Sequence, residues 1–110
     1  MADFKVGQLL RIFVRERDLW HGIPVFTAIV QMLKHENVAG ASVFRGIEGF
    51  GASREIHMAQ MWTLRSELPV LIEVVDEEAK IESLIPRLEE MIVEGAITLE
   101  RVEYLRVTKK

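Results

Sequence analysis

A glycine-rich run with polar side chains is the part of this sequence best suited to bind a ligand. Gly46, Gly49 and Gly51 fall within six residues, directly after the strand-like stretch 41–44. Because glycine has no Cβ, a ligand or a neighbouring subunit can closely approach the backbone of such a strand end. The pattern predicts a small-molecule site at the root of a mobile loop, although glycines at a strand end are equally typical of a β-bulge. The other candidate binding residues lie in or just after this run: Arg45, Glu48, Phe50, Ser53, Arg54 and His57.

Trp20 and His21 form a second candidate pair, just before the first predicted helix. One interpretation is that they cover a bound ligand, since loops often carry binding residues. The other is local hydrogen bonding at the start of a helix. Near the first two predicted strands, a basic excess would help to attract an anion; it comprises Arg11, Arg15, Arg17, Arg45 and Arg54.

Catalytic and metal-binding patterns are weak in this sequence. His21, His35 and His57 lie on three different predicted elements without the spacing of metal ligands, so we predict no metal site. Glu48 is a candidate general base, but the chain has no nucleophile elbow and no Walker-type phosphate loop. We therefore predict no catalytic residues. The alternative is a small oligomeric enzyme with a pocket near Glu48 and His57.

Composition bounds the class of protein. The chain has 110 residues, 49% of them hydrophobic and 28% charged, which predicts a single globular domain over residues 1–110. The net charge of −3 does not favour nucleic acid as a partner. Cysteine is absent, no apolar run approaches the roughly 20 residues that span a bilayer, and the start of the chain does not resemble a signal peptide. We expect a cytoplasmic protein that does not insert into a membrane.

Hydrophobic periodicity and turn residues predict the elements that hold these residues. The order is β-α-β-β-α-β, an α+β ferredoxin-like sandwich in which right-handed crossovers place the first and third strands in the centre. Pro86 should kink the second helix or mark its restart. We expect strands over 8–15, 41–49, 70–75 and 98–107, helices over 24–36 and from 76–78 to Gly95, a polar turn over 16–22, and a loop over 51–64.

Two helices can cover only one face of such a sheet. The predicted strands place Leu9 and Phe13, and likewise Leu71 and Val75, on the other face. Burying several such side chains at about 1.5–3 kcal/mol each favours association. We expect a homo-oligomer whose sheets pack together; the alternative is that the long loop folds back over this face.

Three segments carry a resemblance to a known family: residues 20–22 (WHG), 40–51 (GASVFRGIEGFG) and 68–76 (LPVLIEVVD). From residue 10 to residue 107 the chain resembles the PII-like proteins, specifically a family of unknown function (domain-of-unknown-function family one-ninety). The resemblance implies a homotrimer with its sheets facing the central axis. It also implies a PII-like T-loop between strands 2 and 3, with ligand clefts between subunits beneath it.

In PII proteins those clefts hold adenine nucleotides. Carried over by position, Gly49, Phe50 and Gly51 would line the base, and Arg54 would lie near the phosphates. The segment 94–98 stands where PII proteins have a basic phosphate loop, but here it has one glycine and no cation. We therefore expect AMP rather than ATP, because a triphosphate would be poorly neutralised. The tyrosine that PII proteins modify is not evident, so covalent regulation is not expected.

These observations favour a non-enzymatic PII-like sensor. A small ligand, in our expectation an adenine nucleotide, binds between subunits and reorders the loop. The loop then meets or releases a partner, such as a regulated protein or a membrane transporter. A third hypothesis is an assembly protein that binds no ligand.

Overall fold

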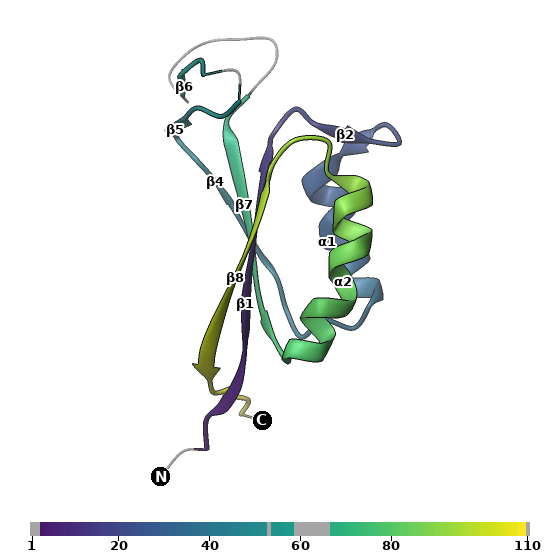
Figure 1. The fold of residues 1–110 in the computed structure, drawn as a ribbon, viewed down its shortest axis with the longest axis vertical. Helices are drawn as coiled ribbons and strands as arrows, with labels where there is room; N and C mark the ends of the chain where they lie inside the picture. Colours follow the sequence, from purple (N-terminus) through teal and green to yellow (C-terminus); the bar gives the residue numbers. More distant parts are fainter. Residues whose placement is uncertain (1–2, 53, 59–66, 110) are drawn as a thin grey trace.

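A four-stranded antiparallel sheet is the central layer of the computed structural model, which describes residues 3–52, 54–58 and 67–109 (Figure 1). The strands lie in the order β4 (Ser42–Arg45), β7 (Pro69–Asp76), β1 (Lys5–Arg15) and β8 (Ala96–Tyr104). The first and third predicted strands are therefore central, as predicted. Both helices, α1 (Val25–His35) and α2 (Glu78–Met91), lie on the same side of the sheet.

The core lies between the sheet and the helices, where the apolar faces of these elements pack together. Alternate residues of β1 and β7 face the helices and are buried, and each helix contributes a stripe spaced by three or four residues. The buried residues of these four elements are Leu10, Ile12, Val14, Val70, Ile72, Val74, Val25, Ala28, Ile29, Met32, Leu33, Ile81, Leu84, Leu88 and Met91.

The residues at the end of α1 and at the start of α2 suit helix termini. α1 ends before Asn37, which adopts a left-handed conformation (φ 62°) that asparagine tolerates, and the amide of Val38 donates to the carbonyl of Leu33. α2 begins with Glu78 in its first turn, where a negative charge interacts favourably with the helix dipole. It continues through Pro86 as one helix, so the predicted restart there is wrong.

Two segments differ from the sequence-based expectation. The predicted polar turn over 16–22 contains part of a small hairpin, β2 (Leu19–Trp20) with β3 (Ile23–Pro24). The predicted strand over 41–49 is divided: β4 ends at residue 45, and β5 (Glu48–Gly49) pairs with β6 (His57–Met58) instead of the main sheet. The division occurs where the Gly46 amide donates to the Pro69 carbonyl (2.7 Å) and the chain leaves the sheet.

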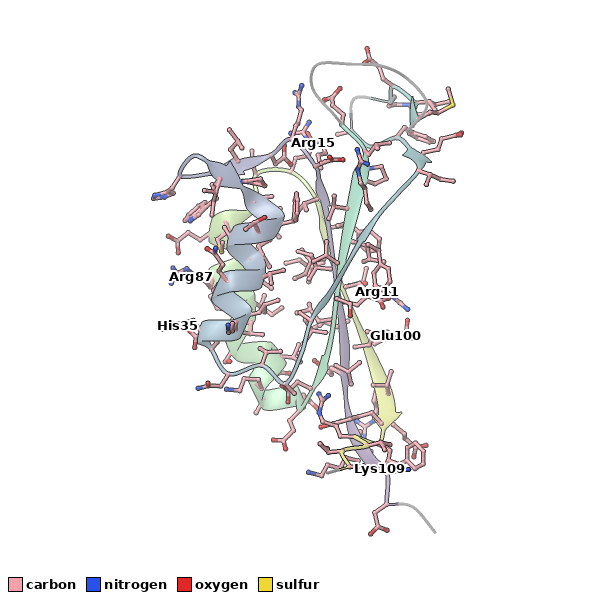
Figure 2. The ribbon with its side chains drawn as sticks, turned by 180° about the vertical axis from the view of Figure 1, so that it is seen from behind. Arg11, Arg15, His35, Arg87, Glu100 and Lys109 are labelled. Atoms are coloured by element: carbon pink, nitrogen blue, oxygen red, sulfur yellow. The ribbon has the colours of Figure 1, made fainter. Side chains whose placement is uncertain are left out.

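The face of the sheet away from the helices is partly apolar, as predicted. The register places Leu9 opposite Val75 and Phe13 opposite Leu71, on the face that α1 and α2 leave open. Between these two pairs, Arg11 lies opposite Glu73 and bonds to it (2.8 Å). Arg11 also contacts Glu100 on β8 (3.2 Å), and Figure 2 shows Arg11 and Glu100 on this open side.

The described parts of the long loop, β5 and β6, lie beyond one end of the sheet in Figure 1 rather than over its open face. Residues 53 and 59–66 lie outside the described part of the chain. Over the described ranges, neither helix is long and apolar enough to cross a membrane.

Candidate functional site

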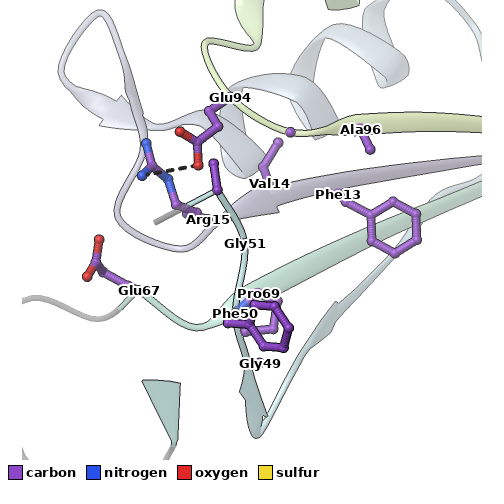
Figure 3. A pocket seen from close by; sticks show the side chains of 12 residues that line it. Phe13, Val14, Arg15, Gly49, Phe50, Gly51, Glu67, Pro69, Glu94 and Ala96 are labelled. Atoms are coloured by element: carbon purple, nitrogen blue, oxygen red, sulfur yellow. Dashed lines mark ion pairs between the residues drawn. The ribbon is translucent and has the colours of Figure 1, made fainter. Parts of the chain in front are cut away.

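A cleft of about 340 Å³ opens at the end of the sheet where β4 gives way to β5 (Figure 3). Four segments distant in sequence form it: the end of β1, the root of the long loop, the start of β7 and the connection from α2 to β8. The topology brings them to one end of the sheet, because β1 ends where β7 and β8 begin. The lining residues are Phe13, Val14, Arg15, Gly49, Phe50, Gly51, Ala52, Glu67, Pro69, Glu94, Gly95 and Ala96.

The three glycines of the predicted site play different parts. A Cβ on Gly46 would lie 2.5 Å from Cγ of Pro69, and one on Gly49 would lie 3.0 Å from the same atom. These two glycines let the chain pass closely over the proline ring at the start of β7. Apart from the residues on either side of it in the chain, no described residue has a heavy atom within 4 Å of the corresponding position on Gly51. The backbone that is open to a guest molecule is therefore at Gly51, whereas Pro69 fills the equivalent space at Gly49.

Phe50 and Arg54 form one unit at the root of the loop. The Arg54 amide donates to the Gly51 carbonyl (2.8 Å), and Arg54 has a left-handed backbone (φ 63°). This tight turn places the Arg54 guanidinium 5.5 Å from the centre of the Phe50 ring, within the range of a cation–π contact. The turn therefore holds a cation beside an aromatic ring of the cleft.

Arg15 is the one cation among the described residues that line the cleft. Its guanidinium bonds to both carboxylate oxygens of Asp18 (3.0 and 3.2 Å from Nε), and Nη1 lies 3.5 Å from Oε2 of Glu94. The hydrogen bond to Asp18, followed by the charges of Asp18, Glu94 and Glu67, raises the pKa of Arg15 above its ordinary value. The described lining thus presents one cation and two carboxylates, and Asp18 also holds that cation. Arg54 adds a second cation next to the lining, beside Phe50.

Four of the five arginines predicted to attract an anion, namely Arg11, Arg15, Arg17 and Arg45, have carboxylate partners. Arg11, as described above, bonds to Glu73, and the hydrogen bond to Glu73 raises the pKa of Arg11. Arg17 pairs with Glu67 (3.0 Å) and Arg45 with Glu16 (2.6 Å). The basic excess seen in the sequence is thus largely neutralised by carboxylates from other elements.

Trp20 and His21 do not reach this cleft. They lie in the β2–β3 hairpin beside the helices, with their rings 4.5 Å apart, and neither lines the cleft. Their position favours the local structural interpretation: His21 has a left-handed backbone (φ 49°) at the tip of the hairpin.

The remaining predicted residues are only partly placed. Glu48 is exposed on β5, opposite Met58, and Gly49 lies opposite His57, so the backbone brings the Glu48 and His57 segments together. Ser53 lies outside the described residues. Across the described ranges, no group of three or more metal-ligating side chains is found.

Sequence reasoning missed several cleft residues, notably Phe13, Glu67, Pro69 and Ala96. The signal that could have found them is topological. In a βαββαβ sheet, strands one and two finish at the same end of the sheet at which strands three and four begin. The family resemblance pointed to one of these segments, residues 94–98, but not to the neighbouring ones.

Comparisons with known proteins give both sequence relatives and structures of similar fold. The DUF190 family model, described as an uncharacterized ACR, matches residues 7–104. A UPF0166 protein of Aquifex aeolicus is 39% identical over 98 residues, covering 89% of this chain and 92% of that protein. A UPF0166 protein of Methanocaldococcus jannaschii is 35% identical over 93 residues, covering 84% and 85%.

Among solved structures, the fold is similar to CPII, a nitrogen regulatory PII-like protein from Thiomonas intermedia K12. CPII bound to ADP, AMP and bicarbonate gives a TM-score of 0.69 at 12% identity, covering 96% of this chain and 94% of that chain. CPII bound to ADP and bicarbonate gives 0.60 at 14% identity, covering 96% and 95%. The PII-like fold expected from the sequence is confirmed.

Proposed function

The chain belongs to the DUF190/UPF0166 family, and from this premise we propose that it is a non-enzymatic PII-like sensor that binds an adenine nucleotide. The observation that carries the proposal is the cleft at the loop root. It has apolar walls and open backbone, in a fold whose structural neighbours were solved with ADP and AMP.

The walls of the cleft suit a planar base. Phe13, Phe50, Pro69 and Ala96 supply apolar surface, and Gly51 leaves its backbone free for close contact. The volume of about 340 Å³ is in the range of small-molecule sites, which combine apolar walls with a few polar groups. An adenine ring would pack between the loop root and the connection from α2 to β8.

The charges of the cleft favour a ligand with few phosphates. Arg15 is the lining cation, and Glu67 and Glu94 are lining anions. A chain of phosphates would lose its hydration without gaining enough cations or fixed donors in return. AMP is therefore the proposed ligand in preference to ATP.

The functional unit in this proposal is a homotrimer. The apolar residues of the open sheet face are half-buried or exposed in the single chain, and packing against further copies would bury them. Neighbouring copies would complete the clefts, and the loop would contact a regulated protein or a membrane transporter. Ligand binding can change that contact only if AMP binds one state of the loop more tightly than the other.

Isothermal titration with AMP, ADP, ATP and cyclic AMP tests the binding. The matched variants are Gly51→Val, which places a side chain in the cleft, and Gly40→Val, at a second glycine with no heavy atom within 4 Å of its Cβ position. We expect Gly51→Val to weaken AMP binding at least tenfold and Gly40→Val to leave it unchanged. No heat and no thermal shift with any of these nucleotides at millimolar concentration would overturn the proposal.

A further inference from the structure

Glu94 places a carboxylate in the proposed nucleotide cleft, next to the cation that lines it. It lies on the connection between α2 and β8, lines the cleft, and directs its carboxylate to Nη1 of Arg15 (Figure 3). Asp18 already takes Nε and Nη2 of the same guanidinium, with 2.9 Å between Nη2 and Oδ1. Glu94 therefore holds the side of Arg15 that Asp18 leaves available, and a phosphate approaching Arg15 must compete with it.

The backbone keeps Glu94 in this position. A Cβ on the next residue, Gly95, would overlap the carbonyl oxygen of Phe13 and lie 3.2 Å from the side chain of Ile92. The connection is thus pressed directly against β1 at the cleft. This close packing of Gly95 against β1 places the Glu94 backbone, and with it a negative charge, at the cleft.

We propose that Glu94 is a specificity-determining residue of this cleft: it acts as a built-in competitor for Arg15 that admits a ligand with one phosphate and rejects ligands with a chain of phosphates. This inference rests on the proposed function. A single phosphate can replace the Glu94 carboxylate on Arg15 and gain charge-assisted hydrogen bonds. Each further phosphate adds negative charge close to Glu94 and Glu67, and among the described residues that line the cleft no cation besides Arg15 is present to offset it.

The test compares AMP and ATP affinities, by titration without divalent cations, for wild type, Glu94→Gln and Glu90→Gln. Glu90 is an exposed residue of α2 and does not line the cleft, so Glu90→Gln makes the same change in net charge elsewhere. We expect Glu94→Gln to lower the ratio of the ATP dissociation constant to the AMP dissociation constant about tenfold. That is the scale of a partly screened charge–charge interaction. Glu90→Gln should leave the preference within twofold of wild type.

A second measurement needs no variant. If like charge rejects ATP, raising the ionic strength should bring the wild-type ATP affinity closer to the AMP affinity, because salt screens the repulsion. A preference that is the same at low and high salt, or the same in Glu94→Gln as in wild type, overturns this inference while AMP binding still supports the sensor. If no nucleotide binds wild type or variants, the proposed function fails, and this inference fails with it.

Discussion

The two faces of the central sheet are built on opposite plans. On the helix-covered face, Ile12 and Ile72 lie opposite each other with no exposed surface, sealed by side chains of the same chain. On the open face, Phe13 lies opposite Leu71 and is 38% exposed, and the adjacent pair is the ion pair of Arg11 with Glu73. The covered face is thus complete within one chain, whereas the open face leaves apolar side chains partly exposed.

This difference separates the folding stability of the single chain from the stability of the proposed assembly of copies. Substitutions on the covered face should lower the free energy of unfolding of each chain, independently of protein concentration. Substitutions on the open face should act mainly on association of the proposed trimer, because a second copy would bury those side chains.

The largest effect is expected from Ile72→Ala. Ile72 is fully buried against the helices, and removing its side chain leaves a cavity that the packed core cannot fill. We expect a loss of about 3–4 kcal/mol in the free energy of unfolding, measured by urea denaturation. The loss should be equal at two protein concentrations tenfold apart, and a strong dependence on concentration would contradict the assignment of this face to the single chain.

Leu71→Asp should separate association from folding. Leu71 lies between Phe13 on β1 and Phe44 on β4, both on the open face. A carboxylate there would be desolvated among apolar side chains in an oligomer, so we expect the dissociation constant to rise about a hundredfold. Analytical ultracentrifugation should show a folded monomer.

The control for that experiment is Gln31→Asp, at an exposed position of α1. It adds the same charge on the helix side and should leave the oligomer intact. A wild-type chain that is already monomeric, or a Leu71→Asp variant that associates normally, would show that copies of this chain do not cover the open face.

Arg11→Gln should have a smaller effect on association. It leaves Glu73 and Glu100 on the open face without their shared cation, which costs little where water reaches them and much more where a second copy excludes water. We expect the dissociation constant to rise about tenfold, measured by the same ultracentrifugation. The matched control is Arg101→Gln on the same strand as Glu100, where residue 101 is exposed and faces away from the ion pair; no change is expected there.

The sequence predicts the covered face better than the site, for a physical reason. The alternation of Leu10 and Ile12 in β1 and the helical spacing of Ile81 and Leu88 are local patterns, so each element and its buried side can be read from its own residues. The apolar half of the open face follows from the same alternation. The bond between Arg11 and Glu73 does not, because it depends on the register of strands 62 residues apart.

The cleft was harder to predict because its residues meet only in the folded chain. Gly46 ends β4 because Pro69 lies against it, and nothing within residues 41–49 indicates that proline. Likewise, the proposed role of Glu94 depends on its contact with Arg15, a residue far from it in the sequence. Residues of the glycine run and of the segment 94–98 line the cleft, but the charge of the cleft follows from pairs that no local pattern contains.

Glu100→Gln should have the smallest effect, and it maps how far the interface extends. Glu100 is the more exposed partner of Arg11, at 63% of its side-chain surface, and lies on the edge strand β8 rather than on β7. In the variant, Arg11 keeps its 2.8 Å bond to Glu73, so we expect a change of at most about 0.5 kcal/mol in the free energy of unfolding. The dissociation constant should change less than threefold. If Glu100→Gln instead matched Arg11→Gln, the surface buried between copies would extend across β8, and the apolar residues of β4 and β7 would no longer be its centre.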